Sequence, residues 1–344
     1  MFVRNTWYVA AWPEEVTQKP LARTLLGDPV VLYRQDDGTA VALEDRCSHR
    51  NLPLSMGEVC GKHIVCAYHG LAYDSAGKCV RVPAQENIPA AAKVRSYPLV
   101  ERDGALWIWM GDAALADAST IVPYPWHTDP GWANKHSYYL IEGQYQLLHE
   151  NLLDLSHVGW VHRNTIGGTP DAHSLATMKT DRDGDCVTVK RYLPDSLPPP
   201  TYVRAVGFEG RIDRWMKIEF FPTLIRVYTG ANDVGKGVDE ERQMDTLGAR
   251  IFNGVTPETE HTTHYFWSAA HNFKVDQPAV TQAFFKEIEA TFLEDKTVME
   301  AQYTRMRQMP MRRVFDIRSD VGGVQAKRVI ASLLEAESST PSGA

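Results

Sequence analysis

Two short pairs of cysteine and histidine constrain this chain more than any other feature of its sequence. Cys47–His49 reads CSH, Cys66–His69 reads CAYH, and sixteen residues separate the two pairs. A pair of this kind, placed at a turn, delivers two metal ligands from one loop, so two pairs can close on one centre. Gly57 and Gly70 allow a tight backbone beside them. The sequence therefore predicts a metal centre held by two neighbouring loops.

Two kinds of centre fit two thiolates and two imidazoles. One is a single tetrahedral zinc ion, and the other is a two-iron, two-sulfide cluster whose cysteines hold one iron and whose histidines hold the other. The ligand count leaves both open, but Cys-x-His with Cys-x2-His is not a usual zinc-finger order and has the form of a Rieske cluster. Such a cluster relays single electrons, because neutral imidazoles raise its reduction potential. Cys60, His63 and Cys79 lie nearby, outside the pairing, and packing is their expected role.

Length and composition limit the class of protein. The chain has 344 residues, 44% of them apolar, which suffices for two domains. Its formal net charge of -7 comes from interspersed acids and bases, which argues against nucleic acid or an anionic membrane as the main partner. No apolar run has the length of a membrane span, and the N-terminus lacks a signal-peptide pattern, so we expect a cytoplasmic protein. The odd count of five cysteines argues against a disulfide framework.

Strand patterns dominate the first part of the chain, up to about residue 112. Two β-rich runs flank Asp37-Gly38, which is a strong hairpin signal, and residues 104–112 have the pattern of a further buried strand. Prolines and glycines then interrupt the strand pattern. We therefore expect a mostly β domain at 1–115 and a second domain at 116–344.

The second domain is expected to combine helices with an open antiparallel sheet. Apolar residues at 145–162 follow a helical period. Short β-type runs fill residues 185–270, and residues 278–306 are rich in helix formers, with no glycine or proline after the first position. The polar end, 337–344, is expected to fray. The predicted fold class is α+β.

A second metal-binding pattern lies at residues 151–162, NLLDLSHVGWVH. Two histidines and one carboxylate form the facial triad of non-haem iron(II), which leaves neighbouring positions open for dioxygen. On a regular helix His157 and His162 would lie roughly 140° apart, so both reach one ion only if the helix bulges or ends between them. Gly159 allows such an irregularity. Asp154 shares a face with His157 and is expected to orient a nearby imidazole.

The carboxylate of the triad must come from elsewhere in the second domain, and Glu294 and Asp295 are the candidates. The residues three and four positions from Asp295 form a largely apolar stripe, so its charge would point into a buried face and need a metal or a partner. The stripe around Glu294 is only slightly more polar, so the preference for Asp295 is small. For both residues the ordinary alternative is a solvated helix face.

Seven stretches together have a recognisable pattern: RNTWYVAAWPEE, CSHRNLPLSMG, CAYHGLAYD, VERDGALWIWMGD, NLLDLSHVGWVH, TPETE and LEDK. Over nearly its whole length the chain resembles the oxygenase components of Rieske non-haem iron oxygenases. It is most similar to the branch of vanillate O-demethylase, dicamba monooxygenase and toluenesulfonate methyl-monooxygenase. The resemblance implies an all-β Rieske [2Fe-2S] domain followed by a helix-grip catalytic domain.

The resemblance also implies roles for single residues. Asp154 would link a cluster histidine of one subunit to an iron histidine of the next in a head-to-tail homotrimer, with Asn151 beside it in the catalytic region. Relatives commonly carry Asp-Asn where Glu150-Asn151 stands here, so this helical turn is expected to differ. The implied cluster ligands are Cys47, His49, Cys66 and His69, and the implied iron ligands are His157, His162 and Asp295.

By the same resemblance, the chain is the terminal oxygenase of a multi-component monooxygenase that oxidises an aryl methoxy or aryl methyl group of an aromatic acid with O2. NAD(P)H electrons would arrive through a separate reductase, because the chain lacks a flavin or nicotinamide fingerprint. A ring-hydroxylating dioxygenase that forms a cis-diol is the first alternative. A non-catalytic Rieske electron carrier or zinc module is the second. Asn253, His264 and Phe285 are candidate walls of the substrate pocket.

Overall fold

The computed structural model describes residues 1–83, 85–236 and 247–339, which form two compact units. The first unit comprises residues 1–121 and 256–260, and the second comprises the other described residues. Within the first unit, Thr256 Oγ1 donates to the carbonyl of Val9 at 2.8 Å. No local sequence pattern marks the association of 256–260 with the first unit. The boundary between the two functional domains that the sequence predicts at 115/116 remains a prediction.

The first unit consists of three antiparallel sheets, with strand orders β1-β11-β10, β2-β3-β4-β9 and β5-β6-β7-β8. The predicted β domain is thereby confirmed. The strands are β1 Trp7–Ala11, β2 Leu21–Leu25, β3 Asp28–Arg34, β4 Ala40–Glu44, β5 Glu58–Cys60, β6 His63–Val65, β7 Ala72–Tyr73, β8 Cys79–Arg81, β9 Ser96–Tyr97, β10 Leu99–Arg102 and β11 Ala105–Trp109. Short 3-10 helices lie at Pro13–Glu15, Leu54–Met56, Ala113–Leu115 and Ala118–Thr120.

The hairpin predicted at Asp37-Gly38 joins β3 to β4, and Gly38 has φ +84°, a conformation that favours glycine. Alternate residues of β3 enter two different apolar clusters. Val30 and Leu32 pack in one cluster, whereas Val31 and Tyr33 pack in the other. The second cluster also contains three buried cysteines, Cys47, Cys66 and Cys79. The core of the β domain therefore extends directly to the loops that carry the Cys/His pairs.

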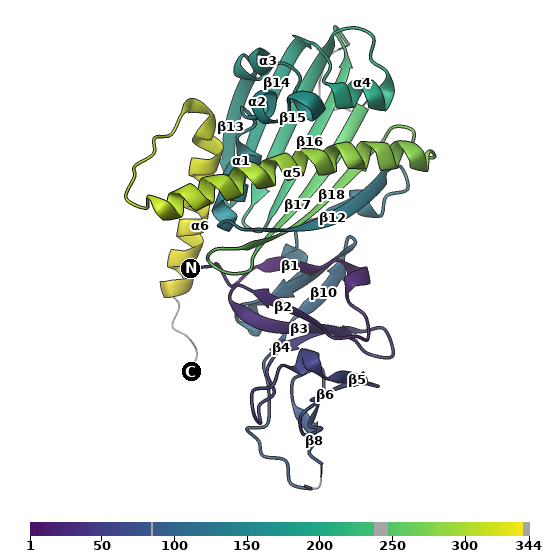
Figure 1. The fold of residues 1–344 in the computed structure, drawn as a ribbon, viewed down its shortest axis with the longest axis vertical. Helices are drawn as coiled ribbons and strands as arrows, with labels where there is room; N and C mark the ends of the chain where they lie inside the picture. Colours follow the sequence, from purple (N-terminus) through teal and green to yellow (C-terminus); the bar gives the residue numbers. More distant parts are fainter. Residues whose placement is uncertain (84, 237–246, 340–344) are drawn as a thin grey trace. The chain divides into compact units, whose positions relative to one another are not determined.

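The second unit is built on one seven-stranded sheet with the strand order β12-β18-β17-β16-β15-β14-β13. Neighbouring strands from β13 to β17 pair antiparallel, and so do β12 and β18. The long helix α5 runs across this sheet (Figure 1). The predicted antiparallel sheet with helices is confirmed. The strands are β12 Ala133–Ile141, β13 Thr177–Asp183, β14 Cys186–Ser196, β15 Ile212–Phe221, β16 Leu224–Asp233, β17 Leu247–Pro257 and β18 Thr263–His271.

The helices of the second unit differ from the sequence prediction in two places. The helical pattern at 145–162 forms two helices instead of one, and α6 was not predicted. Residues 337–339, expected to fray, continue α6, whereas 340–344 lie outside the described residues. The helices are α1 Tyr145–Leu153, α2 Val158–Val161, the π-helix η6 Arg163–Gly167, α3 Pro170–Ser174, α4 Pro200–Val206, α5 Pro278–Gln308 and α6 Val321–Ser339, with 3-10 turns at Pro125–His127 and Arg318–Asp320.

Helix α5 buries one continuous stripe that is apolar except at a few positions. Its buried residues are Thr281, Phe284, Phe285, Ile288, Thr291, Phe292, Asp295, Met299 and Tyr303. Their spacing of three and four places them on one face of the helix. Asp295 is the only charged residue of this stripe, and a buried charge requires a compensating partner. Among the described residues, no helix combines the length and apolarity needed to span a membrane.

Candidate metal centres

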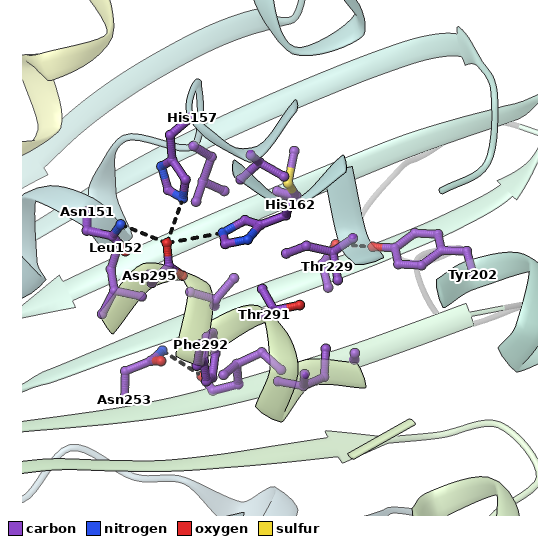
Figure 2. Close-up of a pocket in the computed structure, with 18 of the residues that line it drawn as sticks. Asn151, Leu152, His157, His162, Tyr202, Thr229, Asn253, Thr291, Phe292 and Asp295 are labelled. Atoms are coloured by element: carbon purple, nitrogen blue, oxygen red, sulfur yellow. Dashed lines mark hydrogen bonds and ion pairs between the residues drawn. The ribbon is translucent and has the colours of Figure 1, made fainter. Parts of the chain in front are cut away.

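Three side chains of the second unit converge on one point (Figure 2). The Nε2 atoms of His157 and His162 lie 3.3 and 3.1 Å from Oδ1 of Asp295. One ligand atom from each of the three residues lies within 4.8 Å of the others. His162 and Asp295 are buried, and His157 is partly buried. The arrangement has the composition of a two-histidine, one-carboxylate facial triad.

Both histidines stand at the ends of α2, which explains how residues five positions apart reach one point. His157 is the N-cap of this short helix and His162 its C-cap, with φ -103° and ψ 34°. The irregularity expected from the sequence is present, but not at Gly159, which lies inside α2. A Cβ atom at Gly159 would lie 2.7 Å from Cα of Pro170. The lack of a side chain at Gly159 thus allows the backbone of α2 to lie close to the backbone at Pro170.

Hydrogen bonds on the far side of each ring fix the two histidines. His157 Nδ1 donates to the backbone carbonyl of Asp154 at 2.6 Å, and His162 Nδ1 donates to Oε2 of Glu294 at 2.7 Å. Each Nε2 therefore points at Asp295, and the tautomer is set by the outer partner. In a neutral imidazole with its hydrogen on Nδ1, Nε2 carries a lone pair and no hydrogen. Two lone pairs facing a carboxylate oxygen require protons or a cation, and one divalent cation satisfies all three atoms.

The electrostatics of Asp295 agree with this requirement. Burial acts to raise the pKa of its carboxyl, but the imidazoles of His157 and His162 outweigh burial and lower that pKa. Asn151, from α1, donates from Nδ2 to Oδ1 of Asp295 at 3.0 Å. Asp295 is thus held as an anion that accepts a hydrogen bond from Asn151 and faces the two imidazoles. Sequence reasoning identified all of these residues, but it treated Glu294 as a rival ligand and missed its contact with His162.

Asp154 contacts its surroundings in a different way from the one predicted. Its backbone carbonyl, not its carboxylate, orients His157 within this chain. The carboxylate accepts from Ser156 N and Ser156 Oγ, both at 2.8 Å, and from Ser319 Oγ at 3.2 Å. Arg191 Nη1 lies 3.9 Å from Oδ1. The side chain of Asp154 remains 20% exposed, so its carboxylate is open to further partners.

A cavity lies beside the triad, between α5 and one face of the sheet. Alternate residues of three neighbouring strands form the sheet side, as expected for side chains on one face. The lining residues are Arg214 and Met216 of β15, Val227 and Thr229 of β16, Ala249, Ile251 and Asn253 of β17, Phe284, Ile288, Thr291, Phe292 and Asp295 of α5, and Asn151, Leu152, Leu155, His157, Val158, His162, Ile166 and Tyr202. Most of them are apolar, as in pockets for small organic ligands.

The three residues expected in the pocket wall have different positions. Asn253 lines the cavity, where its Oδ1 accepts from Tyr265 Oη at 2.7 Å. His264 and Phe285 are not among the lining residues. His264 Nδ1 lies 2.8 Å from Tyr138 Oη, and Phe285 stacks on Trp267 with ring centroids 4.9 Å apart. Both side chains pack within the domain core.

In the first unit, the two Cys/His loops share one backbone geometry. In each loop the cysteine N–H donates to the carbonyl five residues later, and the cysteine carbonyl accepts from the N–H four residues later. Asn51 and Gly70, at the same position of each loop, have φ +60° and +71°. The bonds are Cys47 N to Leu52 O and Cys66 N to Leu71 O, both 2.8 Å, and Asn51 N to Cys47 O and Gly70 N to Cys66 O, both 3.0 Å.

These loops place the ligand candidates in two environments. Cys47 and Cys66 are 2% exposed, whereas His49 and His69 are exposed and their ring centroids lie 4.6 Å apart. The hydroxyl of Tyr73 lies 3.2 Å from Cys47 Sγ. Two buried sulfurs beside two exposed imidazoles fit a cluster with one inner and one outer iron.

The neighbouring cysteines do not all behave as expected. Cys79 is buried in the same apolar cluster, and burial raises the pKa of its thiol. Its expected packing role is borne out. Cys60 is exposed on β5, so the expectation of packing was wrong for this residue.

Comparisons with known proteins agree with both centres. Residues 6–98 match the Rieske [2Fe-2S] domain, and residues 141–336 match the vanillate O-demethylase oxygenase C-terminal domain. The chain belongs to the vanillate O-demethylase oxygenase family. The first centre is therefore a Rieske [2Fe-2S] site, which decides between the cluster and zinc. A non-catalytic electron carrier does not account for the match over the second unit.

Two relatives of this Rieske oxygenase align over nearly its full length. It is 42% identical to the putative toluene-4-sulfonate monooxygenase system iron-sulfur subunit TsaM2 of Comamonas testosteroni, over 98% of both chains. It is 34% identical to the vanillate O-demethylase oxygenase subunit of Pseudomonas sp. (strain HR199 / DSM 7063), over 98% of this chain and 96% of the relative.

Solved structures of dicamba monooxygenase have the same fold. The structure bound to 3,6-dichlorosalicylic acid superposes with a TM-score of 0.92 at 34% identity, over 98% of this chain and 99% of that one. The structure with non-heme iron and dicamba superposes with a TM-score of 0.81 at 32% identity, over 98% of both chains. The predicted resemblance and the α+β fold are confirmed.

Proposed function

We propose that this chain is the terminal oxygenase of a multi-component monooxygenase, and that it oxidises an aryl methoxy or aryl methyl group of an aromatic acid. The observation that carries the proposal is the convergence of His157, His162 and Asp295 beside a largely apolar cavity. Relatives named for toluene-4-sulfonate, vanillate and dicamba support the substrate class.

The three triad residues would hold iron(II), and the two Cys/His pairs would hold the cluster. When bound, the iron supplies the activation of dioxygen, and the cluster supplies single electrons. Oxidation of a methoxy carbon gives a hemiacetal, which collapses to a phenol and formaldehyde, whereas oxidation of a methyl carbon gives an alcohol.

The chain itself contributes orientation and exclusion of water. Glu294 and the Asp154 carbonyl hold both imidazoles with Nε2 toward Asp295. Asn151 holds the carboxylate from the helix α1 side. The apolar residues of β16, β17 and α5 would position an aromatic ring and keep solvent from the reacting carbon.

A separate reductase and a cytoplasmic location complete the proposal. Two relatives are named as the oxygenase component of their systems, which supports a partner protein that delivers NAD(P)H electrons.

Asp154 would connect two protomers of a head-to-tail homotrimer. Among the described residues, Oδ1 of Asp154 accepts one hydrogen bond, from Ser156 N. This oxygen can therefore accept a bond from a further donor. Asp154→Asn should retain both metals and the trimer mass but turn over far more slowly. Light scattering and metal analysis check the first two points, and a monomer, or normal turnover in the variant, contradicts this part of the proposal.

The reaction is tested with a panel of methoxylated and methylated aromatic acids, purified protein, a generic reductase and NADH. The proposal predicts formaldehyde from a methoxy substrate or an alcohol from a methyl substrate, in step with NADH oxidation. A cis-diol as the main product would favour the ring-hydroxylating alternative. Formation of neither product, with both metals in place, would contradict the proposal.

A further inference from the structure

Arg214 is a buried cation in the cavity wall and has no counter-ion among the described residues. The residue is 3% exposed and comes from β15, on the same face as Met216. Its Nη1 donates to the backbone carbonyl of Ile166 at 2.9 Å. Among the described residues, its Nε is buried without a hydrogen-bond partner, and no carboxylate pairs with its guanidinium. An unpaired ion in this position keeps the full desolvation penalty of a buried charge.

The surroundings of Arg214 offset only part of that cost. The guanidinium carbon lies 4.9 Å from the ring centre of Tyr202, within the range of a cation–π interaction. A second buried cation, Arg191, lies nearby. Burial, and to a smaller extent the charge of Arg214, lower the pKa of Arg191, whereas Asp154 opposes them. Oδ1 of Asp154 lies 3.9 Å from Nη1 of Arg191, and among the described residues no ion pair joins Asp154 to Arg214.

Among the described residues that line the cavity, Arg214 is also the only lysine or arginine. Near it, Tyr202 Oη and Thr229 Oγ1 form a hydroxyl pair at 2.6 Å. Figure 2 shows this pair to one side of Asp295, with His162 between them. The cavity therefore has a metal-binding end and, apart from it, a wall with one unpaired cation and two hydroxyls.

We propose that Arg214 binds the anionic group of the substrate, a carboxylate or a sulfonate on an aromatic ring. A guanidinium matches the oxygens of either group with parallel N–H donors, and a buried site strengthens the interaction. This inference rests on the proposed function for the identity of the reaction, but the binding itself does not require turnover. Arg214 sets specificity: it selects anionic over neutral ring substituents.

The test is calorimetric titration of the metal-loaded protein, under nitrogen and without reductase. The probes are 4-methoxybenzoate, 4-methylbenzenesulfonate and the neutral 4-methoxybenzamide. Wild-type protein should bind at least one anion about 30-fold more tightly than the amide, as expected for a hydrogen bond to a buried charge. The anion that is preferred identifies the group. Equal affinity for the amide and both anions would overturn the proposal.

Two variants and one control locate the effect. Arg214→Gln should reduce the preference for the anion to a few-fold at most, while binding of the amide stays within about threefold. Arg214→Lys keeps the charge and should retain part of the preference. Arg211→Gln removes an exposed arginine just before β15, which pairs with Asp195, and should leave all affinities unchanged.

The outcomes separate this inference from the proposed reaction. A preference for anions that survives in Arg214→Gln overturns the role of Arg214, whatever the reaction is. If circular dichroism shows that Arg214→Gln is unfolded, Arg214→Lys is compared with wild type instead. The anion preference of the lysine variant must then lie between that of wild type and equal affinity for the anions and the amide. Anion selectivity without oxidation of any methoxy or methyl probe contradicts the proposed reaction but supports the role of Arg214.

Discussion

The two metal-binding regions of this chain are built in opposite ways. The cluster loops take all their ligand candidates from residues 47–69, and their histidines reach the surface. The triad joins both ends of α2 to a residue of α5, far away in the sequence, and is largely buried. A local site is specified by spacing, whereas a site assembled from distant elements exists only when the sheet and α5 are in place. The first suits exchange of electrons at a surface, and the second suits chemistry away from water.

The largest effect is expected from loss of a cluster cysteine. Cys66→Ser should remove the cluster absorbance and acid-labile sulfide and abolish turnover, but leave the mononuclear iron, because the triad takes no ligand from this loop. Metal and sulfide analysis check this. Cys60→Ser is the matched control, since Cys60 is exposed and outside the pairs. Loss of both kinds of iron in Cys66→Ser would break the distinction between the sites.

The reciprocal change is Asp295→Ala. Without the carboxylate the two imidazoles lose their common partner, so the mononuclear iron and activity should be lost while the cluster spectrum stays intact. Iron analysis and visible absorption measure both. Glu289→Gln, on the same helix, is the control and should keep all metals. An Asp295→Ala protein with full iron content would remove Asp295 from the triad.

A smaller effect is expected at the outer partner of the triad. Glu294→Gln replaces the anion that orients His162 by a neutral acceptor, so affinity for iron should fall roughly 10–100-fold. Competition with a chelator measures this. Unchanged affinity would mean that the 2.7 Å contact with His162 Nδ1 does not contribute to metal binding.

The smallest effect concerns packing beneath the histidines. Gly159→Ala places a Cβ atom 2.7 Å from Cα of Pro170, and overpacking of this kind should lower the free energy of unfolding by about 1–3 kcal/mol. Denaturant unfolding measures it. Gly210→Ala has no heavy atom within 4 Å of the new Cβ and should cost nothing comparable. Equal stability of the two variants would show that the backbone near Pro170 yields easily.

The contrast between local and distant contacts also explains what the sequence could predict. The spacing of the two Cys/His pairs predicts a metal centre at these loops, whereas the apolar stripe of α5 gives Asp295 only a small preference over Glu294. The role of Glu294 could not be predicted, because it depends on how α5 lies against α2. The alternation of β15 places Arg214 and Met216 on one face, but only the folded sheet reveals that this face borders the cavity. His264 and Phe285 were wrongly placed in the pocket wall for the same reason.

The most direct test of two separate iron centres is the metal and sulfide content of the purified protein. The account predicts about three iron atoms and about two acid-labile sulfides per chain, two irons with the cluster and one with the triad. Colourless protein that contains zinc and no labile sulfide would contradict it.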